Sequence, residues 1–388
     1  MQYNYNEEKK AKAYIYILFV KILEIFFKVY KKKRNIFPNK IEKILIIKPD
    51  HIGDTIISTI CLKPLKENYP NSKIDVLCGS WGKKTYEYQS KINNIYVLDH
   101  FLLNRKNINF IKKFLIFLYD YYNKIIVLRK KKYDLCIYLR GALKANLITL
   151  TAYIKPKYTI GYTGMGCENL LDEKIEYSQF IPERDNFLNL LKKIPEFKLK
   201  NKKYMYELKL GTNKLIWKKI KIEKNKINVF FNTDGNEKNR KLSIEKIIEI
   251  LKKLEFLENI NIYIVYLPNN EMKMKKLNEE ILKNNLKKTK ILYKTDNFFE
   301  LGNIIKKMNL VITVDTAITH LASIFIKQII VIYEKNPRKY PRFTSNCEKE
   351  YSIISKDNNI SNINVNEIIE SINSLNFKNK QKENRYLY

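Results

Sequence analysis

Hydrophobic and polar residues follow one another along this chain in blocks that predict alternating strands and helices. In the first half, short apolar runs of strand length are separated by segments of helix length. The runs are KILIIK (43–48), KIDVLCG (73–79), NIYVLD (94–99) and YDLCIYL (133–139). Strands that alternate with helices in this way indicate a parallel sheet with helices packed on its faces.

The same alternation starts again in the second half of the chain. The predicted strands are 227–232, 261–268, 290–294, 309–315 and 327–333, of which 327–333 is the last clear one. Helices are predicted between them, including 242–254, 299–308 and 316–325. Two such series of similar size predict an α/β protein of two Rossmann-like, doubly wound domains facing each other across a central cleft.

The 388 residues are enough for two separate hydrophobic cores. The pattern divides the chain into five segments. They are a basic amphipathic N-terminal helix (1–40), a first Rossmann-like domain (41–195), a linker region (196–226), a second Rossmann-like domain (227–375) and a polar tail (376–388).

Two segments have a composition that suits a membrane surface. The first, Ala13 to Arg34, is too short and too interrupted to span a bilayer and lacks the features of a signal peptide. Its aromatic residues and flanking lysines favour a helix lying on an anionic membrane, with packing on the protein body as the alternative. The second, Asn109 to Lys132, predicts a basic, aromatic helix. Ordinary packing on the sheet explains it, although its lysine-rich ends also suit a membrane or an acidic lipid acceptor.

The run KILIIKPDHIGDTIIS, residues 43–58, carries the first candidate chemistry. It predicts a buried strand, a tight loop and a helix whose first turn contains Asp54. A helix N-terminus stabilises negative charge, and an ionised carboxylate there can accept a proton from a substrate hydroxyl. Capping of the helix is the alternative role for Asp54. His51 and Gly53, in the same loop, are assigned to the acceptor side.

A second strand-to-helix turn of this kind follows the strand that ends at Asp315. The next helix begins with Thr316, Ala317 and Ile318, whose backbone N–H groups are expected to bind a phosphate. His320 lies in the first turns of that helix, where packing is the commoner role of a lone histidine. Neither GxGxxG nor GxxxxGK[ST] occurs, which removes the main support for a dehydrogenase or a Walker-type NTPase.

The net charge of +33 predicts attraction to phosphates on lipid, lipopolysaccharide or nucleic acid. The lysines are scattered along the chain, and no zinc-finger spacing or RNA-binding signature occurs, so nucleic acid is not an expected partner. Five dispersed cysteines without a CxxC pair fit a reducing cytoplasm. Only three histidines are present, which argues against a multi-histidine metal centre.

Three stretches of the chain resemble signatures of glycosyltransferase family 9, the bacterial ADP-heptose:lipopolysaccharide heptosyltransferases. KPDHIGDTIIS (48–58), followed by PLKENYPNSKIDVL (64–77), resembles the N-terminal signature. NRKLSIEKIIEIL (239–251) resembles the helix after the first strand of the nucleotide-sugar domain. VDTAITHLASIFIKQIIVIY (314–333) resembles the C-terminal signature. The resemblance spans most of the chain, residues 41–342, with the motifs in the expected order.

The resemblance implies a GT-B architecture with an N-terminal acceptor domain and a C-terminal donor domain. It implies an inverting, metal-independent transfer of heptose from ADP-heptose to the inner core of lipopolysaccharide or lipooligosaccharide, without a cofactor. The enzyme would be cytoplasmic and peripheral at the inner face of the cytoplasmic membrane, with the lipid A/core oligosaccharide and the anionic membrane surface as partners.

The resemblance also assigns roles to individual residues. Asp54 matches the general base. The donor-side residues are Arg240 or Lys241 against the phosphates, Glu271 on the ribose hydroxyls, Asp315 near the donor sugar, Thr316, Ala317 and Ile318 at the phosphate-contacting helix start, and His320 in the same motif.

Two other functions stay open from the sequence. Ala317 stands where the family often has glycine, and Tyr340-Pro341 stands where a tryptophan usually precedes proline. A GT-B transferase that uses another nucleotide-sugar for a surface glycan would fit the same backbone cradle. The non-enzymatic alternative is a basic binding protein for anionic lipid or nucleic acid.

Overall fold

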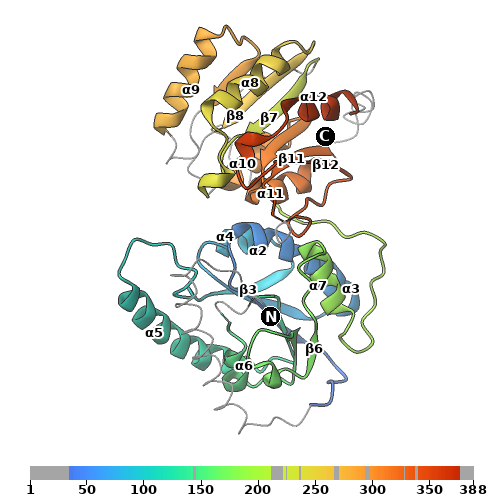
Figure 1. Cartoon of the computed structure of the whole chain (residues 1–388). Helices are drawn as coiled ribbons and strands as arrows, with labels where there is room; N and C mark the ends of the chain where they lie inside the picture. Colours follow the sequence, from blue (N-terminus) through green and yellow to red (C-terminus); the bar gives the residue numbers. More distant parts are fainter. Residues whose placement is uncertain are drawn as a thin grey trace. The chain divides into compact units, whose positions relative to one another are not determined.

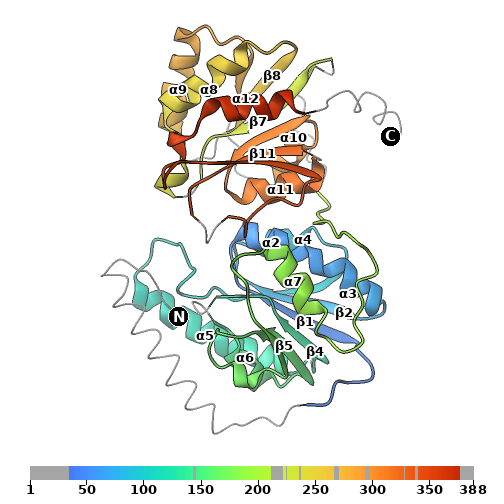
Figure 2. The ribbon, with the colours of Figure 1, turned by 45° about the vertical axis from the view of Figure 1, so that its right-hand side comes forward.

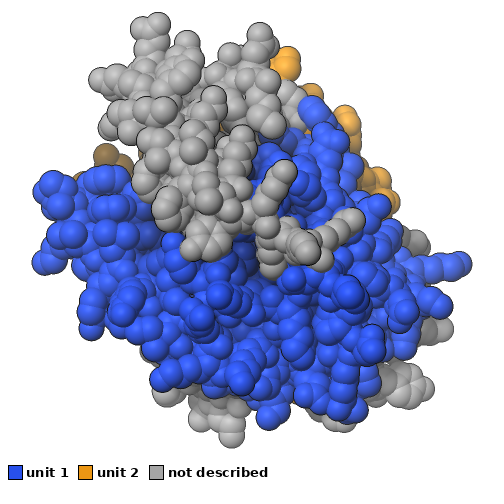
Figure 3. All heavy atoms as spheres, turned by 90° about the horizontal axis from the view of Figure 1, so that it is seen from below, with its two compact units in different colours: residues 1–207 blue, residues 208–388 orange. Residues whose placement is uncertain are grey.

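The computed structural model describes residues 35–142, 146–210, 222–223, 225–235, 237–265, 271–292, 298–326, 328–336 and 340–375. The chain divides into two compact units, Met1–Glu207 and Leu208–Tyr388, which are coloured separately in Figure 3. The division falls within the predicted linker region. The expected N-terminal helix, as far as position 34, and the expected polar tail lie outside the described residues.

The first unit contains a six-stranded sheet in which all neighbouring strands are parallel (Figure 1). The strand order is β3-β2-β1-β4-β5-β6. The strands are β1 (Lys43–Lys48), β2 (Lys73–Cys78), β3 (Ile92–Val97), β4 (Leu135–Tyr138), β5 (Tyr158–Tyr162) and β6 (Glu173–Ile175). The helices are α2 (Ile52–Ser58), α3 (Leu62–Asn68), α4 (Lys83–Glu87), α5 (Phe110–Arg129), α6 (Thr149–Ile154) and α7 (Glu183–Leu191), with 3-10 turns η1 (Thr59–Cys61) and η2 (Glu168–Leu170).

Strand β1 lies in the middle of this sheet, between β2 and β4. Every residue of β1 except Lys43 is buried. A central strand of a parallel sheet is covered on both faces, which is why KILIIK is a continuous apolar run and not an alternating one.

Two groups of helices cover the sheet of the first unit. Helix α2 contacts α4 and α7, and α5 contacts α6. The two groups lie on opposite sides of the sheet (Figures 1 and 2). The contact between α5 and α6 includes a 3.0 Å hydrogen bond between the Tyr121 and Thr149 hydroxyls.

The second unit repeats this arrangement with a six-stranded parallel sheet in the order β12-β11-β10-β7-β8-β9. The strands are β7 (Ile227–Asn232), β8 (Ile260–Val265), β9 (Thr289–Leu292), β10 (Leu310–Val314), β11 (Gln328–Tyr333) and β12 (Lys349–Ile354). The helices are α8 (Ile244–Glu255), α9 (Glu271–Lys283), α10 (Phe298–Ile305), α11 (Ala317–Phe325) and α12 (Val365–Asn373), with 3-10 turns η4 (Lys238–Arg240) and η6 (Ile360–Asn362).

Helix α8 shows how the sequence forms the core of the second unit. The Ser243 side chain caps its N-terminus by accepting from the Lys246 backbone N–H at 3.2 Å. Ile247, Leu251 and Leu254 then follow at helical spacing and are buried in the core beneath the sheet. The prediction of two doubly wound α/β units is confirmed.

Three strands extend the sheets beyond those that the sequence pattern predicts. Strands β5 and β6 follow β4 in the first unit, and β12 follows β11, so 327–333 is not the last strand. Strand β12 (KEYSII) is half-buried with polar residues between apolar ones, and β6 has three residues. Both lie at the edge of a sheet, where the long apolar runs typical of central strands are not required.

Candidate active site

Asp54 lies where the sequence predicts it, in the first turn of α2 directly after the central strand of the first unit. The residue is half-buried. The N-cap position is His51, and it forms no side-chain capping bond. Among the described residues, the Asp54 carboxylate forms no hydrogen bond or ion pair, so it does not cap the helix and stays available to a ligand.

The loop before α2 is held by a tryptophan from the turn that follows the neighbouring strand β2. The Trp81 indole N–H donates to the backbone carbonyl of Asp50 at 2.7 Å and also approaches the carbonyl of Pro49 at 3.2 Å. Its ring centre lies 5.4 Å from that of His51. The tryptophan therefore fixes the path of the loop and covers one side of it.

Helix α2 is also fastened to α4. The hydroxyls of Thr55 and Thr85 are 2.9 Å apart, and those of Ser58 and Tyr86 are 2.7 Å apart. A Cβ atom at Gly82 would lie only 2.6 Å from Thr55 Cγ2, so the start of α4 fits against α2 only with glycine. These contacts set the position of the turn that carries Asp54.

A buried ionic cluster lies beneath this turn. The Lys48 ammonium contacts the Asp50 carboxylate at 3.0 Å and the Glu183 carboxylate at 3.8 Å, and it donates to the Leu139 carbonyl at 2.8 Å. Arg140 forms a second ion pair with Asp50. All four charged side chains are buried or nearly so. Buried charges persist only when they are paired, so this cluster locks Asp50, and with it the loop, in one position.

The second candidate turn lies in the second unit and joins β10 to α11. Asp315 follows the strand and is buried. Thr316 is the N-cap of α11, and its hydroxyl accepts from the Ile318 backbone N–H at 3.2 Å. Ala317 is the first helical residue and is half-buried. This geometry is that of an anion-binding helix start at the carboxyl end of a central parallel strand.

Arg240 from η4 lies against this turn. Its guanidinium contacts the Asp315 carboxylate at 3.1 Å and donates to the Asp315 carbonyl at 3.3 Å. A second carboxylate, Glu334 directly after β11, lies 3.4 Å from Arg240 Nε and also accepts from the Asn239 amide. Glu334 is almost completely buried. The structure thus brings Arg240 and Asp315 together.

Gly235 and its neighbours form a tight loop beside Arg240. The Gly235 N–H donates to the Arg240 carbonyl at 2.7 Å, and Asp234 pairs with Lys241 through an isolated β-bridge. A Cβ at Gly235 would lie 2.8 Å from Arg240 Cβ, so the loop requires glycine. Lys273 in α9 contacts Asp234 at 2.5 Å and joins this loop to α9.

The other predicted donor-side residues are placed as follows. Lys241 is half-buried after η4, and Glu271 is exposed at the first residue of α9. His320 is buried within α11. Its burial favours the packing role, because a side chain inside the core does not reach a ligand at the helix start.

Sequence reasoning misses several residues around both turns. Lys48, Asp50, Arg140 and Glu334 each stand at or directly after the end of a strand. Polar residues at the carboxyl ends of parallel strands are a usable signal, because those ends meet at one edge of the sheet. Trp81 and Glu183 come from loops and helix starts and give no such signal.

Burial excludes two tyrosines near these turns from proton transfer. Burial raises the pKa of Tyr86, which contacts α2, well above its ordinary value. Burial, followed by the nearby Glu350 carboxylate, does the same for Tyr333 at the end of β11. Neither phenol ionises near neutral pH, so Asp54 is the better candidate for a base.

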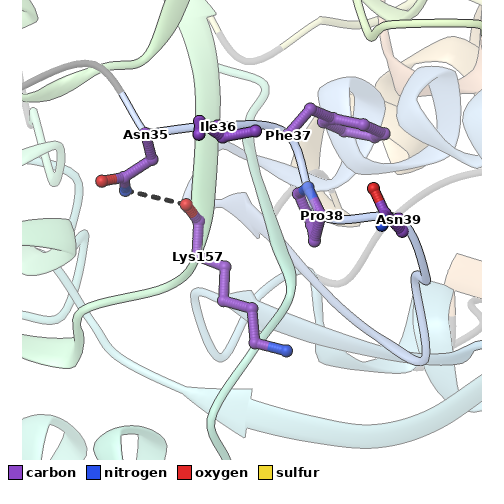
Figure 4. Close-up of a pocket in the computed structure, with 6 residues that line it drawn as sticks. All are labelled: Asn35, Ile36, Phe37, Pro38, Asn39 and Lys157. Atoms are coloured by element: carbon purple, nitrogen blue, oxygen red, sulfur yellow. Dashed lines mark hydrogen bonds between the residues drawn. The ribbon is translucent and has the colours of Figure 1, made fainter.

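Two further features concern other kinds of site. Among the described residues, no group of three or more His, Cys, Asp and Glu side chains is arranged to hold a metal ion. An open hollow of about 550 Å³ is lined by Asn35, Ile36, Phe37, Pro38, Asn39 and Lys157 (Figure 4). It contains none of the candidate residues.

The chain was compared with protein families, curated proteins and solved structures. The model of glycosyltransferase family 9 (heptosyltransferase) matches residues 125–369. A comparison with curated proteins finds no match.

Solved structures with the same fold include three of this family. The family 9 glycosyl transferase of Veillonella parvula has a TM-score of 0.69 at 16% identity and covers 88% of this chain and 98% of its own. ADP-heptose lps heptosyltransferase II of E. coli has a TM-score of 0.65 at 14% identity, covering 86% and 98%. E. coli heptosyltransferase WaaC with ADP has a TM-score of 0.65 at 15% identity, covering 85% and 99%.

Proposed function

The chain belongs to glycosyltransferase family 9, the heptosyltransferase family, and on that premise we propose that it transfers heptose from ADP-heptose to the inner core of lipopolysaccharide or lipooligosaccharide. It is a glycosyltransferase with the GT-B fold. The E. coli WaaC structure contains ADP, which supports an adenine nucleotide as the donor group.

The observation that carries this proposal is the Asp54 carboxylate, half-buried and without a partner among the described residues. Inverting transfer needs one base that takes a proton from the acceptor hydroxyl as its oxygen attacks the anomeric carbon. The bond to the departing diphosphate breaks in the same step, and the configuration at carbon inverts. Asp54 is the base in this scheme, and the ionic cluster under its loop fixes its position.

The β10–α11 turn of the second unit supplies the donor side of the proposal. The departing ADP carries negative charge, and in this proposal the N–H groups at the start of α11 and the Arg240 guanidinium stabilise it. The helix start and the position of Arg240 beside Asp315 support this role. Helix dipole and guanidinium together take the part that a divalent cation plays in other transferases. We therefore expect transfer to proceed without a metal ion.

The catalytic role of Asp54 is tested by replacing it with alanine. Because general base catalysis contributes about 10²–10⁴-fold, kcat should fall by about that factor while KM for the donor changes little. The matched control is Glu176→Ala, at an exposed position directly after β6 in the same unit. An Asp54→Ala enzyme with unchanged turnover would exclude this residue as the base.

The donor is tested by calorimetry against ADP, ADP-heptose and UDP- and GDP-sugars, with and without EDTA. Preferential binding of ADP-heptose in both conditions is the expected result. Preference for another nucleotide-sugar would move the enzyme to a different surface glycan. Binding that EDTA abolishes would contradict the metal-independent scheme.

The site of action in this proposal is the cytoplasmic face of the inner membrane, where the acceptor is a phosphorylated lipid. In the part of the chain that the structure describes, every helix is too short or too polar to cross a bilayer. The +33 net charge supports attraction to anionic headgroups.

A further inference from the structure

Helix α5 of the first unit has hydrophobic side chains on the face that points away from the protein. Tyr119 is 71% exposed, Ile111 66% and Leu115 59%. The exposed apolar side chains of this helix are Phe110, Ile111, Leu115, Ile116, Leu118, Tyr119, Tyr122, Ile126 and Val127. We call this set the outer α5 surface.

The opposite face of α5 already packs against the first unit. Phe117 and Leu128 are buried there, and the Phe117 ring centre lies 4.7 Å from that of His100. A helix on a protein surface normally has one apolar stripe and a polar outer face. In α5 the outer face is apolar as well, so packing on the sheet does not explain its composition.

The spacing of the exposed residues makes the outer α5 surface continuous. Ile111, Leu115, Leu118, Tyr122 and Ile126 succeed one another at intervals of three and four residues, which places them along one side of a helix. With 20 residues the helix is about 30 Å long. A continuous exposed apolar strip of this size marks an interaction surface.

The charges around the strip indicate what it contacts. From residue 105 to residue 132 the basic residues are Arg105, Lys106, Lys112, Lys113, Lys124, Arg129, Lys130, Lys131 and Lys132, and the one acidic residue is Asp120. The cations gather at the two ends of the helix. Apolar and aromatic residues bounded by lysine and arginine match the boundary between the headgroups and acyl chains of an anionic bilayer.

We propose that the outer α5 surface docks the enzyme onto an anionic lipid bilayer, with α5 lying parallel to the membrane plane. The charged residues within the helix are incompatible with a span, in agreement with the lack of a membrane-spanning helix among the described residues. The proposal rests on the proposed function in one respect: a lipid-borne acceptor gives the enzyme a reason to stay at the membrane.

Charge also distinguishes this partner from a second copy of the chain. Pairing two α5 helices face to face would bring two sets of these cations together, which costs energy. An anionic bilayer attracts these cations instead, and each cation near its surface contributes about 1 kcal/mol of favourable binding free energy.

The position of α5 is tested with Leu118→Trp in the full chain, mixed with vesicles of phosphatidylglycerol and phosphatidylcholine that carry brominated acyl chains. The matched control is Met272→Trp on the exposed face of α9 in the second unit. After the emission of the unmodified chain, which contains Trp81 and Trp217, is subtracted, the indole at 118 should emit at shorter wavelength and be quenched by bromine, whereas the one at 272 should not. An unquenched tryptophan at 118 would overturn the proposal.

The contribution of the surface to binding is tested with Leu115→Ser, Leu118→Ser and Tyr122→Ser combined. The partition coefficient of this triple variant on the same vesicles should be at least about tenfold lower than that of the unmodified chain, because three apolar side chains no longer enter the bilayer. The control combines Phe256→Ser, Met272→Ser and Leu282→Ser, which are also exposed, and should bind as the unmodified chain does.

The other occupants of this surface give different outcomes. If the α5 variant binds vesicles as well as the unmodified chain does, another segment contacts the membrane and the proposal is overturned. If the unmodified chain is a dimer and the α5 variant a monomer, the surface binds a second copy, which also overturns the proposal. No sugar donor is present in these assays. A chain that docks through α5 and yet transfers no sugar would therefore contradict the proposed function and leave the docking surface standing.

Discussion

Asp54 and Asp315 both lie where a buried strand leads into a helix, Asp54 in the first turn of its helix and Asp315 just before the N-cap, but the two carboxylates are held differently. Asp54 has no hydrogen-bond or ion-pair partner among the described residues. Asp315 is buried and paired with Arg240, which also contacts the buried Glu334. A carboxylate that must accept a proton has to be accessible, whereas one that positions a guanidinium has to be buried beside it.

Replacing Arg240 with alanine should weaken ADP binding about 10- to 100-fold, because a charge-assisted contact to the phosphates is lost. The same change removes one positive charge from beside the buried Asp315 and Glu334, so the melting temperature should also fall. Calorimetry and thermal unfolding measure the two effects. Lys238→Ala, at an exposed position of η4, is the control and should change neither. Unchanged ADP affinity in the Arg240 variant would remove this residue from the donor site.

Asp134 gives the first unit a predictable response to acid. Burial alone would raise its pKa, but hydrogen bonds from Lys157 and from the backbone N–H groups of Glu42 and Lys43 outweigh this and lower it. A lowered pKa in the folded state stabilises the fold at pH values above the ordinary carboxylate pKa. This stabilisation is lost as the pH falls through the lowered pKa.

The Asp134→Asn variant should therefore have a free energy of unfolding about 1–2 kcal/mol lower than the parent at neutral pH. The difference should shrink as the pH drops below about 4. Urea unfolding at a series of pH values measures it. Glu258→Gln, at an exposed position, should show no such difference. A difference in the free energy of unfolding that persists below about pH 4 would mean that asparagine destabilises the unit for a reason other than the lost carboxylate charge.

Helices α2 and α4 are so close at Gly82 that one added methyl group should displace α2, the helix that carries Asp54. Gly82→Ala should lower the free energy of unfolding by about 1–3 kcal/mol, because the new Cβ collides with Thr55. Since the collision pushes on the helix that carries Asp54, kcat should fall as well. Ser90→Ala, an exposed change just after α4, serves as the reference. A variant with parental stability and turnover would show that the two helices separate without cost.

The sequence predicts the central elements of both sheets well and their edges poorly. Strands β1, β7 and β10 are buried on both faces and so are continuous apolar runs, which periodicity recognises. Strands β6 and β12 are short or half-buried and gain their structure from a neighbouring strand. The position of Asp54 follows from the local strand–turn–helix pattern. The pairing of Arg140 with Asp50 does not, because those residues meet only through the parallel pairing of β1 with β4.

The two units divide the proposed chemistry between them, with the base in the first and the phosphate contacts in the second. ADP should therefore slow hydrogen exchange mainly at residues 238–241 and 310–325 of the second unit. The amides of β1 should exchange at an unchanged rate. Mass spectrometry of the exchanged chain makes this comparison directly. Protection confined to the first unit would reverse the assignment of donor and acceptor sides.

The order of the strands in each sheet leaves a central strand unpaired while the chain is being synthesised. In each sheet the strand made first lies in the middle, with later strands added on both sides. The ribosome completes β1 at Lys48, but its partner β4 ends only at Tyr138. Until then one edge of an almost wholly apolar strand is open to other nascent chains. Overproduction in a host with few chaperones should thus yield aggregates, and slower translation should improve the soluble yield.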